Sequence, residues 1–74
     1  MMKRYTKSLK NLGWKIQKLR KKVKLTQEEL ANEMKISRVY MGYIEQGRES
    51  PSLRLLMKIA RKLKVKIEDL FHIL

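Results

Sequence analysis

The 74-residue sequence predicts a single compact all-α domain of five short helices. Apolar residues recur at intervals of three and four, which is the spacing of one helix face. Hydroxyl-bearing residues precede three of these apolar segments, where they can cap helices. One proline and three glycines leave few residues for the turns of a β fold. Because 43% of the residues are hydrophobic, the chain can build a small core.

The first helix is predicted over residues 8–23. One apolar stripe, with successive spacings of 3, 4, 3 and 4, is formed by Leu9, Leu12, Ile16, Leu19 and Val23. Trp14 lies off this stripe, at the edge of the core or on the surface. Residues 1–7 show no such periodicity, so we expect a flexible basic N-terminal arm followed by one domain over residues 8–74.

The second and third helices are predicted over residues 27–34 and about 37–46. Thr26 and Glu29 can form a capping box, in which each side chain accepts a hydrogen bond from the other's backbone. Ser37 can cap the third helix, and Gly47 can end it. Two helices joined by a turn of about three residues form a helix-turn-helix arrangement.

The fourth and fifth helices follow a loop at residues 50–52. Ser52 is expected to cap the fourth helix, which carries the apolar residues Leu53, Leu56, Ile59, Ala60 and Leu63. The last short helix is expected to hold the core residues Ile67, Leu70 and Phe71.

The third helix has an outward face that suits contact with another molecule. On a projection of about 100° per residue, Met41 and Ile44 fall together on the buried side. The opposite face carries Val39, Gly42 and Tyr43, with Arg38 and Tyr40 at its flanks. Arginine and tyrosine supply hydrogen bonds, and valine can touch a thymine methyl group. Gly42 either allows close approach of a large partner or is a tolerated surface glycine.

The charge is strongly positive and uneven. Lys+Arg is 19 and Asp+Glu is 7, which gives a net charge of +12. Ten of the basic residues and none of the acidic ones lie in residues 1–24. A small chain with this charge most often meets a polyanion. The alternative is a surface that only keeps the protein in solution.

Several classes of function are disfavoured. The absence of cysteine excludes disulfides and thiolate metal sites. Short apolar runs predict neither a membrane span nor a signal peptide. With one histidine, His72, and no glycine-rich phosphate loop, we predict no enzyme activity, no metal and no cofactor.

Four motifs resemble the phage-repressor-type (Xre/Cro-like) helix-turn-helix family. They are L-T-Q-E-E-L-A, I-S-R-x-Y-x-x-x-I-E-x-G, P-S-L-x-x-L-x-K-I-A and E-D-L-F, at the family's spacing over residues 19–71. The resemblance implies a five-helix, lambda-repressor-like domain that binds double-stranded DNA sequence-specifically, with its third helix in the major groove. It implies a cytoplasmic, nucleoid-associated transcriptional regulator that acts as a repressor.

The resemblance also implies roles for individual residues. Base contacts are implied for Arg38, Val39, Gly42 and Tyr43. Phosphate contacts are implied for Gln27, Ser37, Tyr40, Gly47 and Arg48. Arg20 and Glu45 match a partly buried ion pair between the first and third helices. The sequence departs from the family at Lys24, Lys35 and Lys64, where glycine is usual, and at Lys66, where a hydroxyl cap is common.

Family members of this size usually bind palindromic operators as homodimers. Candidate interface residues are Leu55, Ile73 and Leu74, which lie outside the predicted core. A second reading is an antitoxin-type or other protein-interaction module with the same fold. A third is a basic amphipathic helix on anionic membranes, which residues 1–24 alone could supply.

Overall fold

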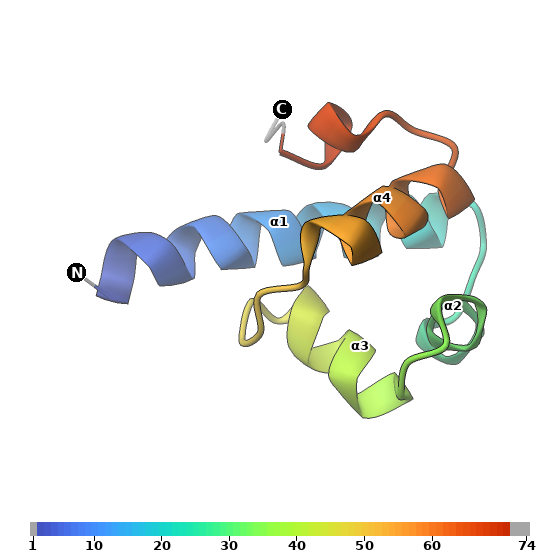
Figure 1. The fold of residues 1–74 in the computed structure, drawn as a ribbon, viewed down its shortest axis with the longest axis horizontal. Coiled ribbons are helices and arrows are strands. Elements are labelled where there is room, and N and C mark those ends of the chain that lie inside the picture. The colour runs from blue at the N-terminus through green and yellow to red at the C-terminus, as the bar shows by residue number, and fades with distance from the viewer. Residues whose placement is uncertain (1, 72–74) are drawn as a thin grey trace.

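The computed structural model describes residues 2–71, with side chains from residue 7, as four α-helices and a final 3₁₀ helix (Figure 1). The elements are α1 (Met2–Lys22), α2 (Gln27–Met34), α3 (Arg38–Glu45), α4 (Leu53–Lys62) and η1 (Ile67–Phe71). No strand occurs in this part of the chain, so the predicted all-α fold is confirmed. The fifth element is a 3₁₀ helix rather than an α-helix. None of the helices over residues 2–71 is long and apolar enough to cross a membrane.

Helix α1 begins at Met2, so the predicted helix start at residue 8 is wrong. Residues 2–7 contain neither proline nor glycine, and extending an existing helix costs far less than starting one. Apolar periodicity detects only the part of a helix that packs on the core. The first turns of α1 extend past the other elements, as Figure 1 shows.

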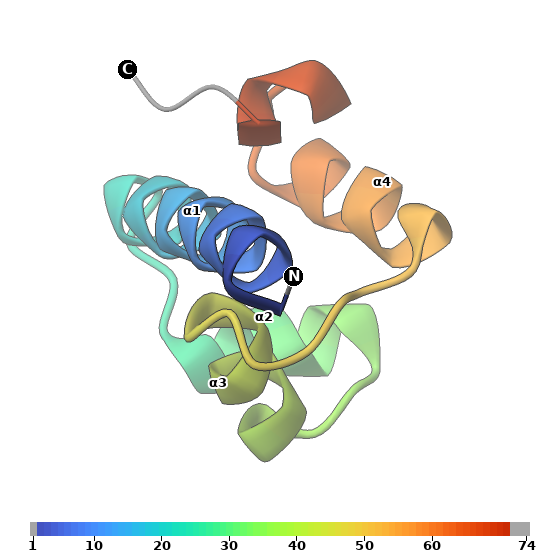
Figure 2. The ribbon, with the colours of Figure 1, turned by 90° about the vertical axis from the view of Figure 1, so that its left-hand side faces the viewer.

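The core lies where the five elements meet (Figure 2). Its buried hydrophobic residues come from every element and are Leu12, Ile16, Leu30, Ala31, Met34, Met41, Ile44, Leu56, Ile59, Ala60, Leu63 and Leu70. Three residues of the predicted apolar faces are exposed instead: Val23 by 37%, Leu53 by 65% and Phe71 by 57%. Each stands at or just beyond a helix end, where neighbours cover only one side. Phe71 directly follows Leu70, so when Leu70 points inward Phe71 points away.

The predicted helix caps are present. The Thr26 hydroxyl accepts from the Glu29 backbone N–H over 3.0 Å, and the Glu29 carboxylate accepts from the Thr26 N–H over 2.8 Å. The hydroxyls of Ser37 and Ser52 likewise accept from backbone N–H groups at the starts of α3 and α4. At η1, where Lys66 provides no cap, the Asp69 carboxylate reaches back to the Lys66 N–H over 3.0 Å.

The three lysines at the family's glycine positions adopt the left-handed conformation. The φ angles of Lys24, Lys35 and Lys64 are 62°, 60° and 63°. Each lysine follows a helix, and the turn ends as it would with glycine. The Cβ atom makes this conformation cost about 1–2 kcal/mol per residue. The helix ends are therefore formed at the expense of stability rather than distorted.

Candidate nucleic-acid interface

Helix α3 lies at the lower side of the molecule in Figure 1, with α1 and α4 above it. The turn after α2 leads directly to Ser37, whose hydroxyl accepts from the Tyr40 N–H over 2.9 Å and starts α3. Arg38 and Val39 follow at the first turn of α3 and are exposed, Val39 by 53%. An exposed valine beside an exposed arginine forms a surface that offers both an apolar group and hydrogen-bond donors.

Gly42 does not lie on the open face that the projection predicts. It is buried, because the Gln27 side chain from α2 lies over it. A Cβ placed on Gly42 would lie 3.7 Å from Gln27 Oε1 and 3.9 Å from Nε2, which is ordinary contact. Because Gln27 comes from α2, a projection of the third helix alone does not contain the side chain that covers Gly42.

A hydrogen-bonded chain runs from the interior to Arg38. Gln27 Nε2 donates to Glu45 Oε1 over 2.9 Å, and Arg38 Nη1 donates to Gln27 Oε1 over 3.4 Å. A carboxylate only accepts, so Glu45 fixes which end of the Gln27 amide points inward. The amide oxygen then faces Arg38. The Gln27 amide is thus engaged on both sides.

The predicted ion pair between Arg20 and Glu45 is present. Arg20 Nε and Nη2 donate to the two Glu45 carboxylate oxygens over 2.7 and 3.1 Å. The two side chains are only 7% and 2% exposed. Arg20 Nη1 also donates to the Leu25 carbonyl over 2.6 Å. The pair joins α1 to the C-terminal end of α3 and therefore holds α3 in place.

Gly13, which the sequence reasoning missed, brings α1 and α3 into close contact. A Cβ at Gly13 would collide with the Ile44 carbonyl oxygen and would lie 2.5 Å from that of Glu45. The one signal in the sequence is a glycine inside a helix, which costs about 1 kcal/mol relative to alanine. Here backbone packs on backbone next to the Arg20–Glu45 pair.

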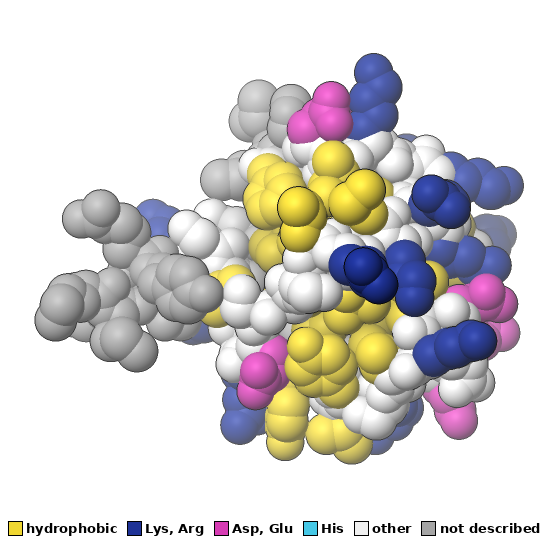
Figure 3. All heavy atoms as spheres, in the orientation of Figure 1, with side chains coloured by type: hydrophobic (Ala, Val, Ile, Leu, Met, Phe, Trp, Pro, Cys, Tyr) yellow, Lys and Arg dark blue, Asp and Glu magenta, His cyan; other side chains and the backbone are white. Residues whose placement is uncertain are grey.

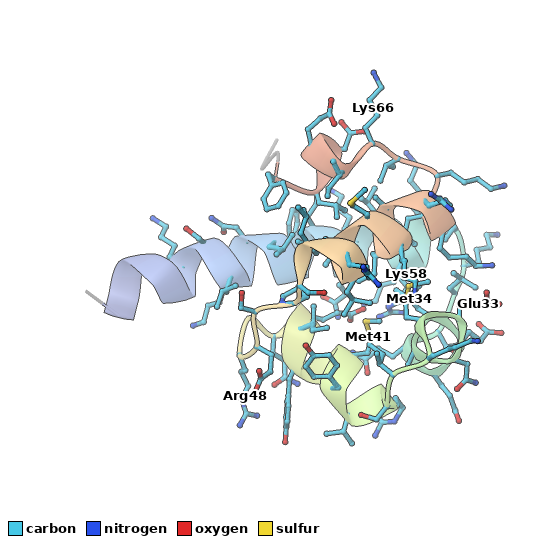
Figure 4. All side chains as sticks on the ribbon, in the orientation of Figure 1. Glu33, Met34, Met41, Arg48, Lys58 and Lys66 are labelled. Atoms are coloured by element: carbon cyan, nitrogen blue, oxygen red, sulfur yellow. The ribbon has the colours of Figure 1, made fainter. Side chains whose placement is uncertain are left out.

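The loop after α3 places Arg48 beside Tyr43. The Arg48 guanidinium carbon lies 4.5 Å from the centre of the Tyr43 ring, and its Nη1 is 3.5 Å from Gln46 Oε1. Figure 4 shows Arg48 directed toward the lower edge of the molecule, where α3 lies. An arginine held over an aromatic face is a positioned cation with free N–H donors.

The loop backbone is less available than the resemblance implies. Gly47 N–H donates to the Ile44 carbonyl over 3.1 Å, and Arg48 N–H donates to the Tyr43 carbonyl over 2.8 Å. Gly47 is buried against α1 with φ of 76°, and a Cβ there would lie 2.6 Å from Lys10 Cα. Tyr40 is half-buried against the core. In this loop the backbone N–H groups of Gly47 and Arg48 are engaged, while the Arg48 side chain is exposed.

The structure describes one of the three candidate dimer-interface residues, and it is not fully exposed. Leu55 is half-buried against the core and lines a groove with Ile36 and Tyr40. Ile73 and Leu74 lie outside the described residues, as does His72. Exposed apolar side chains instead gather over α4 and η1, on the face shown in Figure 3. They are Leu53, Met57 and Phe71, each more than half exposed.

The fold and the arrangement of α2 and α3 define a helix-turn-helix protein. The family described as helix-turn-helix (HTH_3) matches residues 16–70, and the chain belongs to it. This confirms the resemblance drawn from the four motifs.

Relatives and solved structures agree with this family. A protein of Archaeoglobus fulgidus named as an HTH-type transcriptional regulator is 46% identical over 57 residues, covering 77% of this chain and 81% of that protein. The immunity repressor of Bacillus phage phi105 is 39% identical over 56 residues, covering 76% of this chain and 39% of the repressor. The crystal structure of the restriction-modification controller protein C.AhdI from Aeromonas hydrophila superposes with a TM-score of 0.80 at 33% identity. That superposition covers 85% of this chain and 96% of the controller.

Proposed function

We propose that this chain is a DNA-binding transcriptional regulator that represses by placing α3 in the major groove of an operator. The observation that carries the proposal is the exposed first turn of α3, with Arg38 and Val39, held by the chain of hydrogen bonds through Gln27 to Glu45. The relatives named as transcriptional regulators and as a phage repressor support it. Such a protein would act at the nucleoid in the cytoplasm.

Arg38 is the proposed principal base reader. Its bond to Gln27 is long, at 3.4 Å, and uses one of five N–H donors. The remaining donors suit the O6 and N7 acceptors of guanine, which arginine binds in a bidentate manner. Val39, exposed beside Arg38, is proposed to contact a thymine methyl group. Gly42 lies beneath the Gln27 side chain.

Arg48, Ser37 and Tyr40 are proposed to contact phosphates, which set the position on the duplex without reading sequence. Arg48 has the strongest support because Tyr43 and Gln46 hold its guanidinium. Gln27 is proposed as a further phosphate contact, because its bond to Glu45 uses only one of the two N–H donors of its amide nitrogen.

We further propose a homodimer on a palindromic operator. Leu53, Met57 and Phe71 are the apolar residues that a two-fold interface would cover, in place of Leu55. Two copies related by a two-fold axis would bind half-sites about 34 Å apart, one turn of the duplex.

Selection of bound duplexes from a random pool tests the proposal. We expect a palindromic site containing at least one guanine, and a loss of base preference at that position in Arg38→Ala. Binding should also be steep in salt, since roughly 6–10 phosphate contacts lose about 10³–10⁵ in affinity between 50 and 200 mM salt. A pool that stays random, or binding that ignores salt, would contradict the proposal.

A further inference from the structure

The side of α1 that faces away from the core carries an exposed tryptophan among lysines. On a projection of about 100° per residue, four side chains fall within a sector of about 60°. We call them the α1 outer stripe: Lys7, Trp14, Lys18 and Lys21, all exposed. The core residues Leu12 and Ile16 lie on the opposite side of the helix.

The outer stripe has no negative charge to neutralise it within α1. The helix contains no acidic residue, and the lysines of the stripe form no ion pair within the described part of the chain. Trp14 is 47% exposed, although tryptophan is large and apolar. Lys18 Nζ lies 4.9 Å from the centre of its ring, so cation and aromatic face form one surface.

The outer stripe also faces away from α3, whose first turn is proposed to read bases. Gly13 and Arg20 make the contacts with α3 and lie on the far flank of α1 from the stripe. Figure 2 looks along α1 and shows α3 below it and α4 to its right, with no described element on its left. A ligand on the stripe would therefore leave Arg38 accessible, whereas the loop that carries Arg48 borders the stripe at Lys10.

We infer that the α1 outer stripe binds an unpaired nucleic-acid strand. Trp14 would stack on a base, while Lys7, Lys18 and Lys21 would neutralise phosphates on either side, which is how single strands are held without sequence preference. A duplex keeps its bases stacked and offers Trp14 no free base face. An anionic membrane is disfavoured because the apolar side of α1, with Leu12 6% and Ile16 0% exposed, is already buried in the core.

Trp14 is the one tryptophan of the chain, so its fluorescence reports on the stripe directly. Titration with oligo-dT of about 12 nucleotides should quench this fluorescence to saturation, and the self-complementary duplex selected as operator should not. Oligo-rU of equal length tests whether the strand is DNA or RNA. Quenching by either polymer supports the site, and the polymer that binds with the higher affinity identifies the kind of strand. Titration with vesicles of phosphatidylserine and phosphatidylcholine tests the alternative of an anionic membrane. Trp14 emission that shifts to the blue with vesicles, and is unaffected by either strand, overturns the inference.

Variants locate the binding surface. Measured by anisotropy of labelled oligo-dT, Trp14→Ala should weaken binding about fivefold or more, and Trp14→Phe should keep most of it, since either ring can stack on a base. Lys18→Gln/Lys21→Gln should weaken binding more than Lys58→Gln/Arg61→Gln, which removes the same charge from exposed positions on α4. Equal losses in the two double variants, or full affinity in Trp14→Ala, would show that the strand binds by net charge elsewhere.

Single-strand binding by the α1 outer stripe can be tested independently of the operator proposal. Trp14→Ala should retain full affinity for the selected duplex, and Arg38→Ala should retain full affinity for oligo-dT. Failure of the wild type to bind any duplex would refute the operator proposal alone, because Trp14 quenching by single strands could still be observed.

Discussion

Gln27 Nε2 donates a hydrogen bond to Glu45 Oε1 over 2.9 Å and so attaches the start of α2 to the buried ion pair of α1 and α3. The same carboxylate oxygen accepts from Arg20 Nη2 over 3.1 Å. The Glu45 carboxylate of α3 therefore accepts hydrogen bonds from both α1 and α2, and it orients the Gln27 amide that faces Arg38. Within the described residues, every buried side-chain nitrogen and oxygen has at least one hydrogen-bond partner, and those of this network are among them.

Glu45→Ala should unfold the domain or nearly so. It leaves the Arg20 guanidinium buried without its partner, which typically costs about 3–5 kcal/mol. A domain of this size has about 3–5 kcal/mol from its core, so little stability would remain. Urea denaturation followed by circular dichroism measures the change. Glu33→Ala is the matched control, since it breaks the exposed Lys62–Glu33 pair at 3.6 Å and should cost less than about 1 kcal/mol. A stability of Glu45→Ala equal to that of the control would refute a structural role for the pair.

The two helical glycines should respond to alanine with opposite signs. Gly42→Ala should stabilise by about 1 kcal/mol, because the new methyl group meets only the Gln27 side chain at ordinary contact distance. Gly13→Ala has the same helix propensity gain but forces a carbon against the backbone of Ile44 and Glu45, and overpacking of this kind costs about 1–3 kcal/mol or more. Thermal unfolding of both variants gives the comparison. A stabilised Gly13→Ala would mean that α1 and α3 separate easily.

The left-handed lysines offer stabilising substitutions. Glycine at position 24, 35 or 64 removes the Cβ that makes φ near 60° unfavourable, so each variant should gain about 1 kcal/mol. The three sites end different helices, and their gains should add. Lys22→Gly is the control: it lies in the last turn of α1, with ordinary helical backbone, and should lose about 1 kcal/mol. Equal effects at positions 22 and 24 would contradict the conformational explanation.

Local signals predicted most of the fold. The caps at Thr26, Ser37 and Ser52 and the apolar spacing each depend only on residues close in sequence. The helices predicted from them are present. Periodicity did not reveal the first turns of α1, which lie beyond the core. Nor did it show that Leu53 and Phe71 are exposed, because burial at a helix end depends on what other elements cover.

The site was predicted less completely. The Arg20–Glu45 pair was implied by family resemblance, since 25 residues separate its members in sequence and no local rule joins them. Gly42 was misplaced because a single-helix projection omits Gln27. The role of Gly13 depends on the contact between α1 and α3, which no pattern within α1 reveals. The stacking of Arg48 on Tyr43 depends on the path of the loop after α3.

Tyr43 should act on DNA affinity through Arg48 rather than by reading a base. A cation over an aromatic ring at an exposed site is worth about 0.5–1 kcal/mol, so Tyr43→Leu should weaken binding to all sequences by about two- to fivefold. Tyr43→Phe keeps the ring and should bind like the wild type. Arg48→Ala should weaken binding uniformly and reduce the salt slope by about one. In that background Tyr43→Leu should have no further effect, which affinity measurements over a double-mutant cycle would show. If Tyr43→Phe and Tyr43→Leu instead lose affinity equally, and only at one base position, the Tyr43 hydroxyl contacts a base and the ring does not serve Arg48.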